Sequence, residues 1–149
     1  MSGSLKKGII VAGMHSSSGK TAVTSLVLAA TQKRGLSIQP FKIGPDFIDP
    51  GFHLHYSSKN SVNLDSWIMG RDHVVQAAGE FTKNSLGVAE GVMGLFDGSD
   101  PETDVGSTME IARWLGWKIL LVVPCQNAGR SITAAIQGFL REAGGVKHF

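Results

Sequence analysis

The chain has 149 residues, the length of one modest domain, and its composition of 42% hydrophobic and 17% charged residues is that of an ordinary globular protein. The net charge of +2 is small, Lys and Arg are scattered, and the longest apolar runs are strand-length, so neither a nucleic-acid partner nor membrane insertion is expected. With a single cysteine no intramolecular disulfide can form, which fits a cytoplasmic protein.

The first half of the chain alternates between strand and helix patterns after residues 1–7, which are expected to be a tag remnant or a disordered N-terminus. Ile9–Ala12 is a continuous apolar run, typical of a strand buried on both faces of a parallel sheet. Thr21–Lys33 has apolar residues at helical spacing, and Ser37–Ile43 predicts a second strand. Gly44–Gly51 holds two prolines and two aspartates and is expected to be a loop. The following stretch, 53–70, is expected to be irregular, with a short helix near its tryptophan.

The second half continues the alternation, and an S-x-x-E capping box at residue 107 opens one of its helices. It is expected to hold a helix at Asp72–Lys83, a strand at Leu86–Glu90, a long loop at Gly91–Gly106, a helix at Ser107–Leu115, a strand at Lys118–Pro124 and a helix at Ser131–Ala143. This order predicts an α/β fold with a mostly parallel sheet and helices on both faces. Because the alternation calls for a further strand after residues 144–145, the domain is expected to be truncated.

A phosphate-binding loop is predicted between the first strand and the first helix, where residues 13–21 are GMHSSSGKT. Glycines and small serines let backbone N–H groups surround phosphate oxygens at a helix N-terminus, whose dipole favours anions. Lys20 is expected to reach the β- and γ-phosphates, and the Thr21 hydroxyl to ligate Mg²⁺. The match is not strict, since the motif's usual first glycine falls on Met14. The loop predicts binding of ATP with Mg²⁺ in a P-loop NTPase-like, three-layer fold. The expected ligand-binding residues are Gly13, His15, Ser16, Ser17, Ser18, Gly19, Lys20 and Thr21.

Charged side chains follow the ends of other predicted strands. Lys42, Asp46 and Asp49 come at or after the end of the second strand, and Glu90 ends the third, with Asp97 in the next loop. Ligands of open α/β sheets collect at the carboxyl ends of the strands. Carboxylates that face a triphosphate require a hard cation between them, and a lysine can neutralise charge on a transferring phosphoryl group. The alternative interpretation is that these are solvated loop charges, with the aspartates acting as turn formers beside prolines.

Three segments resemble one known family: Phe41–His53 (FKIGPDFIDPGFH), Asn63–Asp65 (NLD) and Glu90–Gly98 (EGVMGLFDG). Together they closely resemble the cobyrinic acid a,c-diamide synthase family, which is related to dethiobiotin synthetase. The resemblance extends over residues 8–139. It implies that residues 8–149 are the N-terminal, ATP-binding synthetase domain of that family, in incomplete form.

The activity implied by this resemblance is a ligase reaction of cobalamin biosynthesis. ATP would phosphorylate the a and c carboxylates of cobyrinic or hydrogenobyrinic acid, and ammonia would displace the phosphate. The ammonia would come from glutamine in a C-terminal glutamine amidotransferase domain with a cysteine nucleophile, which this sequence does not contain. The expected partners are therefore a small corrinoid substrate and the glutaminase domain of the full-length enzyme, and a homodimer is left open.

The resemblance also implies roles for individual residues. His53 lies in the matched segment, so it is expected to contact substrate rather than a metal. The implied catalytic residues are Lys20, Lys42, Asp46, Asp49, Glu90 and Asp97, and the implied metal ligands are Thr21, Asp49 and Glu90. Two alternatives keep the fold but change the substrate: a dethiobiotin synthetase-like ligase and a nickel-tetrapyrrole diamide synthase. A switch-type P-loop ATPase is an alternative of another class, although residues 14–18 lack the second lysine typical of that group.

Overall fold

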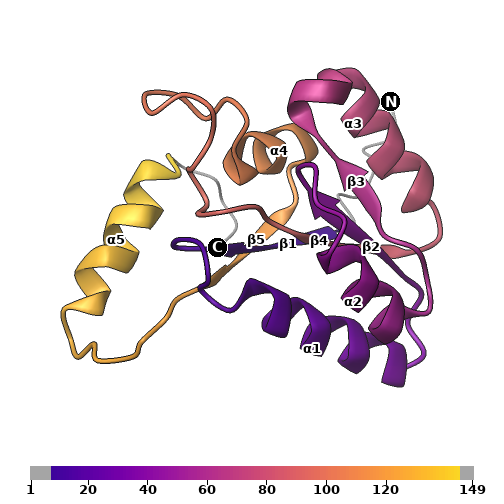
Figure 1. Ribbon diagram of the computed structural model, residues 1–149, viewed down its shortest axis with the longest axis horizontal. Helices are drawn as coiled ribbons and strands as arrows, with labels where there is room; N and C mark the ends of the chain where they lie inside the picture. The colour runs from indigo at the N-terminus through magenta and orange to yellow at the C-terminus, as the bar shows by residue number, and fades with distance from the viewer. Residues whose placement is uncertain (1–7, 145–149) are drawn as a thin grey trace.

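The computed structural model describes residues 8–144, so the expectations for residues 1–7 and for the segment after Gly144 lie outside the described residues. Within them the chain forms one five-stranded sheet with helices on both faces, as Figure 1 shows. The strands are β1 (Gly8–Gly13), β2 (Ile38–Ile43), β3 (Val62–Leu64), β4 (Leu86–Glu90) and β5 (Lys118–Val122). The helices are α1 (Lys20–Lys33), α2 (Asp49–Ser57), α3 (Ser66–Phe81), α4 (Thr108–Leu115) and α5 (Ile132–Glu142).

All strand pairs in the described sheet are parallel, in the order β3-β2-β4-β1-β5. Helices α1 and α2 pack together on one face, and α3 and α4 pack together on the other. This confirms the predicted three-layer α/β fold of P-loop NTPase-like type. No helix in residues 8–144 is both long and apolar enough to cross a membrane.

Two apolar clusters hold the layers together. The larger one joins the sheet to α3 and α4 and includes Phe41, Val74 and Ile111. The smaller one joins Leu28 of α1 to Val88 of β4. Because strands β1 and β2 are buried at nearly every position, both faces of the sheet are covered, as the continuous apolar runs predicted.

The loop predicted at Gly44–Gly51 and the irregular stretch after it are wrong in part, because residues 49–57 form helix α2. Pro50 lies in the first turn of this helix. A proline is tolerated there because first-turn N–H groups have no intrahelical acceptor, and its fixed φ suits a helix. The proline that indicated a loop therefore begins a helix.

Two further elements between Val62 and Phe81 also differ from the prediction. Strand β3 has only three residues, too few to show an alternating pattern, and it exists because it pairs with β2. Helix α3 begins at Ser66 rather than at Asp72, because the Asp65 carboxylate accepts hydrogen bonds from two N–H groups of the first turn. Gly70, with φ of 70°, interrupts the helix with a kink. The helix predicted at Asp72–Lys83 therefore corresponds to the part of α3 beyond the kink, and the short helix predicted near Trp67 is confirmed as the part before it.

Candidate active site

The loop between β1 and α1 is closed on itself by Ser18. The Ser18 hydroxyl donates to the His15 carbonyl oxygen at 2.6 Å and accepts from the His15 N–H at 3.0 Å. Ser17 and Gly19 have φ values of 62° and 94°, in the left-handed region that glycine adopts most easily. The conformation of the loop is therefore fixed by hydrogen bonds within the loop itself.

Helix α1 begins directly after this loop and has no capping side chain. The first-turn N–H groups of a helix lack intrahelical acceptors, and the helix dipole is positive at this end. Ser16, Ser17 and Gly19 line the pocket in front of the helix. This is the arrangement that the predicted phosphate loop requires.

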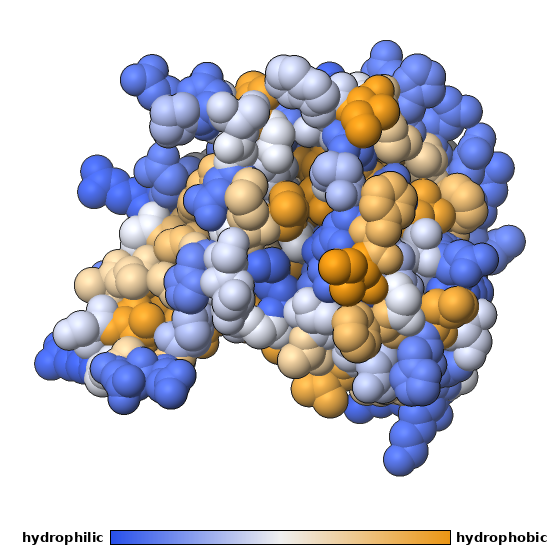
Figure 2. Space-filling view, in the orientation of Figure 1, coloured by the Kyte–Doolittle hydropathy of each residue, from blue (hydrophilic) through white to orange (hydrophobic). Residues whose placement is uncertain are grey.

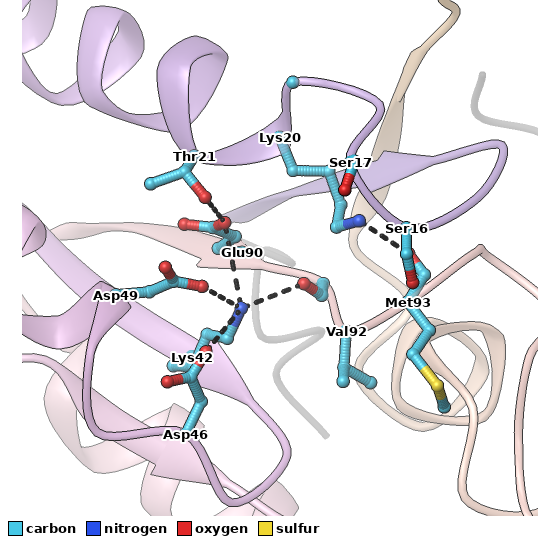
Figure 3. A pocket seen from close by; sticks show the side chains of 12 residues that line it. Ser16, Ser17, Lys20, Thr21, Lys42, Asp46, Asp49, Glu90, Val92 and Met93 are labelled. Atoms are coloured by element: carbon cyan, nitrogen blue, oxygen red, sulfur yellow. Dashed lines mark hydrogen bonds and ion pairs between the residues drawn. The ribbon is translucent and has the colours of Figure 1, made fainter.

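The pocket itself has a volume of about 390 Å³ and lies between the loop and the carboxyl ends of β2 and β4 (Figure 3). The side chains that line it come from segments far apart in the sequence. The lining residues are Ser16, Ser17, Gly19, Lys20, Thr21, Lys42, Asp46, Asp49, Glu90, Gly91, Val92 and Met93. The parallel sheet thus brings the phosphate loop and the acidic strand ends to one site.

Lys20 lies across the loop with its ammonium group against backbone carbonyls. Its Nζ donates to the Met93 carbonyl at 2.6 Å and lies 3.4 Å from the His15 carbonyl. Burial, followed by the like charge of Lys42, lowers the pKa of Lys20 below its ordinary value. Met93 was not predicted as a site residue, and its positive φ of 46° carries no sequence signal.

Lys42 and Glu90 are direct neighbours in the register of β2 and β4, so their side chains leave the sheet side by side. The Lys42 ammonium lies 2.6 Å from Asp49 Oδ2, 3.4 Å from Asp46 Oδ2 and 3.7 Å from Glu90 Oε1. It also donates to the Gly91 carbonyl at 3.2 Å. A buried lysine is therefore surrounded by three carboxylates, as Figure 3 shows.

Glu90 is almost completely buried, at 1% exposure, and both of its carboxylate oxygens have partners. Oε1 accepts from the Thr21 hydroxyl at 2.6 Å, and Oε2 lies 2.8 Å from Nε2 of His53. Burial alone would raise the pKa of Glu90. The hydrogen bonds from His53 and Thr21 and the charge of Lys42 outweigh burial, so the pKa lies below its ordinary value.

Asp46 and Asp49 have pKa values shifted in opposite directions. For Asp49, burial is the largest cause, and with the nearby charge of Glu90 it raises the pKa despite the hydrogen bond from Lys42. For Asp46, burial is again the largest single influence, but the Ile48 N–H and the contacts with Asp49 and Lys42 together lower the pKa. One carboxyl of the pair therefore binds a proton more readily than the other.

Not every residue predicted for the site lines the pocket. Gly13, His15 and Ser18 belong to the loop but do not line the pocket. The Asp97 carboxylate also lies outside the pocket lining, where it accepts a hydrogen bond from the Gly94 N–H at 2.8 Å in the turn after β4. His53 is fully buried behind Glu90, so the expectation that it contacts substrate is wrong in this structure. The site residues brought together are Ser16, Ser17, Gly19, Lys20, Thr21, Lys42, Asp46, Asp49 and Glu90.

The donor set suits a magnesium ion bound together with phosphate. The Thr21 hydroxyl and the carboxylates of Asp49 and Glu90 line one pocket, and their hard oxygen atoms are of the kind that Mg²⁺ prefers. Among residues 8–144, no three or more His, Cys, Asp or Glu side chains are grouped as a metal site of their own. Mg²⁺ is commonly held by one or two carboxylates plus substrate phosphates, and these residues fit that mode.

The parallel sheet, the uncapped helix behind a serine-rich loop and the buried lysine among carboxylates define an α/β protein of P-loop NTPase-like type. No model of a known protein family matches the chain. Individual curated proteins, however, do match it in sequence. It is similar to the cobyrinate a,c-diamide synthase of Syntrophotalea carbinolica, with 43% identity over 132 residues, which are 88% of this chain and 29% of that protein.

It is likewise similar to the hydrogenobyrinate a,c-diamide synthase of Rhodobacter capsulatus, with 44% identity over 91% of this chain and 32% of that protein. The cobyrinate a,c-diamide synthase of Thermoplasma volcanium is 42% identical over 88% of this chain and 29% of that protein. The predicted resemblance is therefore confirmed: nearly nine tenths of the chain is homologous to cobyrinate and hydrogenobyrinate a,c-diamide synthases. The chain spans about a third of the length of these relatives.

Proposed function

We propose that this chain is the ATP-binding synthetase part of an enzyme that amidates the a and c carboxylates of cobyrinate or hydrogenobyrinate in cobalamin biosynthesis. The glutamine amidotransferase domain that supplies ammonia would be another part of the same longer protein. The similarity to cobyrinate and hydrogenobyrinate a,c-diamide synthases supports the choice of substrate. The observation that carries the chemistry is the buried Lys42 among three carboxylates, in the same pocket as the phosphate loop.

The proposed reaction has two steps. An oxygen of the substrate carboxylate attacks the γ-phosphorus of ATP, the bond from that phosphorus to the bridging oxygen breaks, and ADP leaves. Ammonia then attacks the carbon of the acyl phosphate, a proton leaves the nitrogen, and phosphate departs with the electrons of the broken C–O bond. The product is a primary amide, and little covalent chemistry is asked of the protein.

The chain's own residues position the reactants and neutralise charge. The N–H groups at the start of α1 bind phosphate oxygens, and Lys20 exchanges its Met93 carbonyl for a phosphate oxygen. The Lys42 ammonium, held by Asp49 and Glu90, stabilises negative charge on the transferring phosphoryl group. The Thr21 hydroxyl with the carboxylate of Glu90 or Asp49 would hold Mg²⁺, which would supply a further positive charge beside the phosphates.

Product analysis tests this proposal. The protein is incubated with ATP, Mg²⁺ and an ammonium salt, and with either cobyrinate or hydrogenobyrinate, and the products are identified by mass spectrometry. We expect a monoamide and then an a,c-diamide, formed with one ADP per amide. Parallel incubations contain a nickel tetrapyrrole, or a diamine with bicarbonate, in place of the corrinoid. Conversion of either of these without conversion of the corrinoid, or ATP-dependent dimerisation without any amide, would contradict the proposal.

A further inference from the structure

His53 of α2 lies directly behind the pocket and has no exposed surface. Its Nε2 is 2.8 Å from Oε2 of Glu90, the carboxylate oxygen that faces away from Thr21. The other oxygen, Oε1, accepts from the Thr21 hydroxyl at 2.6 Å. Glu90 therefore bridges a buried histidine and the first turn of the phosphate-binding helix.

The orientation of the His53 ring is fixed on its far side as well. Nδ1 lies 3.0 Å from the hydroxyl of Ser61, the residue immediately before β3. An ionised carboxylate can only accept, so the network assigns the proton between His53 and Glu90 to Nε2. Nδ1 is then free to accept the hydroxyl hydrogen of Ser61. The Ser61 hydroxyl, which can donate as well as accept, is compatible with the tautomer that Glu90 requires and holds the far side of the ring in place.

A second partner competes for the same carboxylate. The Lys42 ammonium is 3.7 Å from Glu90 Oε1, at the limit of an ion pair, and 2.6 Å from Asp49. A buried carboxylate oxygen without a donor is costly, so Glu90 without its bond to His53 would turn toward Lys42. Thr21 would then lose its acceptor at the point where the hydroxyl is expected to meet Mg²⁺.

We propose that His53 is a positioning residue, oriented by Ser61, that holds Glu90 toward Thr21 and so sets the affinity of the site for Mg²⁺ bound with nucleotide. It touches neither substrate nor phosphate and acts only through Glu90. The inference rests on the proposed function in one respect, that this pocket binds a magnesium–nucleotide complex. Partners that hold a metal ligand in place commonly contribute a factor of ten to a hundred to metal affinity or activity.

Two substitutions of His53 distinguish a role in positioning Glu90 from a role in packing alone. The amide nitrogen of Gln reaches about as far as histidine Nε2, so His53→Gln keeps a donor for Glu90. The amide of Asn reaches about as far as Nδ1, so His53→Asn keeps a partner for Ser61 and loses the bond to Glu90. His55→Asn serves as a control, because His55 lies on the same helix and is exposed.

The measurement is the Mg²⁺ concentration that half-saturates binding of a fluorescent ATP analogue, with thermal unfolding and steady-state kinetics recorded beside it. For His53→Asn we expect this concentration to rise about ten- to a hundredfold. Binding of the analogue without Mg²⁺ and the KM for the tetrapyrrole should stay within about twofold, since neither contact is changed. His53→Gln should restore most of the loss, and His55→Asn should match the wild type.

Ser61→Ala keeps the result decisive if His53→Asn does not fold. It should raise the Mg²⁺ requirement by about fivefold, the equivalent of one neutral hydrogen bond. Equal losses in His53→Asn and His53→Gln, or an unchanged Mg²⁺ requirement in the folded variants, would overturn the inference and leave His53 a packing residue. A wild-type protein that binds no nucleotide with Mg²⁺ would instead contradict the proposed function, and this inference with it.

Discussion

The two ends of the sheet are both buried, but one is packed with apolar groups and the other with charges. At the amino ends, the indole of Trp117 lies against Gly8 and Gly87, so closely that a Cβ on either glycine would overlap the ring. At the carboxyl ends, Lys42 and Glu90 are 3% and 1% exposed, and the Lys42 Nζ lies 3.7 Å from Oε1 of Glu90. Apolar burial stabilises a fold directly, whereas burying an ion pair costs desolvation that its attraction barely offsets. The amino end therefore contributes stability directly, whereas the carboxyl end carries a buried charge cluster that costs stability, as expected for the reaction site proposed above.

Figure 2 shows one face of the molecule, on which hydrophilic and hydrophobic residues interleave. Several large apolar side chains that belong to segments around the carboxyl ends are exposed, among them Phe47, Ile48 and Trp67. No such exposure is found for Trp117, which is 4% exposed at the opposite end. Substitutions at the carboxyl ends should therefore change activity, with a cost in stability where a charge is left buried without its partner, whereas substitutions at the amino ends should change stability alone.

Lys42→Met should have the largest effect. We expect kcat for amidation to fall by about a hundred- to a thousandfold, as is typical when one preorganised charge is removed from a reacting centre. The free energy of unfolding should also fall, by roughly 3 kcal/mol, because Glu90 and Asp49 lose their common cation. Steady-state kinetics and chemical denaturation measure the two effects.

The control for this variant is Lys59→Met. Within residues 8–144, the Lys59 ammonium donates hydrogen bonds to the hydroxyls of Ser37 and Ser85. Both serines lie next to the amino ends of β2 and β4, away from the pocket. Lys59→Met should keep the wild-type kcat. A Lys42→Met protein that retains more than about a tenth of the wild-type kcat would show that the cluster is not the reacting centre.

Gly87→Ala should have the opposite profile. The added Cβ overlaps three atoms of the Trp117 ring in a closed core, so the free energy of unfolding should fall by about 1–3 kcal/mol. The kcat per folded molecule should not change, because the site lies at the far end of the strand. Urea denaturation and kinetics at a temperature where the variant is folded provide the comparison.

Gly138→Ala is the matched control for that prediction. A Cβ at Gly138 of α5 would meet nothing within 4 Å, so the helix preference of alanine should raise stability by up to about 1 kcal/mol. If Gly87→Ala were as stable as the wild type, the packing of Trp117 would not be what stabilises the amino end.

The smallest effect we expect is on the pH dependence of stability. The folded-state pKa of Glu90 lies below its ordinary value of 4.5, so its contribution is present above about pH 4.5 and is lost as the pH falls through the folded pKa. The pKa of Asp49 lies above its ordinary value of 3.8, so its ionisation opposes folding, and that cost appears as the pH rises from 3.8 through the folded pKa.

Denaturation of Glu90→Gln and Asp49→Asn across about pH 3 to 6 measures both contributions. As the pH falls, the wild type should lose stability relative to Glu90→Gln and gain it relative to Asp49→Asn. Differences of the same sign for the two variants would contradict the charge arrangement described for the cluster.

The sequence was sufficient for four of the five strands, β1, β2, β4 and β5, and for one half of the site. The apolar run before Gly13 and the helical spacing after Lys20 predicted β1, α1 and the loop between them, because both signals are local. The placement of Lys42 beside Glu90 followed from the rule that parallel strands end at one edge. Their direct pairing became known only from the register of β2 and β4.

What sequence reasoning missed depends on tertiary contacts. Helix α2 was hidden because Pro50 was interpreted as part of a loop, although a proline also begins helices. The role of His53 was mistaken because its partner, Glu90, is far away in the chain, and nothing local shows that a histidine is buried. Strand β3 exists only through its pairing with β2.

The most direct test of the central claim, that the phosphate loop and the Lys42 cluster form one carboxylate-activating site, follows an oxygen atom. The a and c carboxylates of the corrinoid substrate are labelled with a heavy oxygen isotope, and the phosphate released during amidation is analysed by mass spectrometry. The mechanism predicts that one labelled oxygen enters phosphate for each amide formed, because the carboxylate oxygen leaves with the phosphoryl group. Unlabelled phosphate alongside amide formation would contradict it.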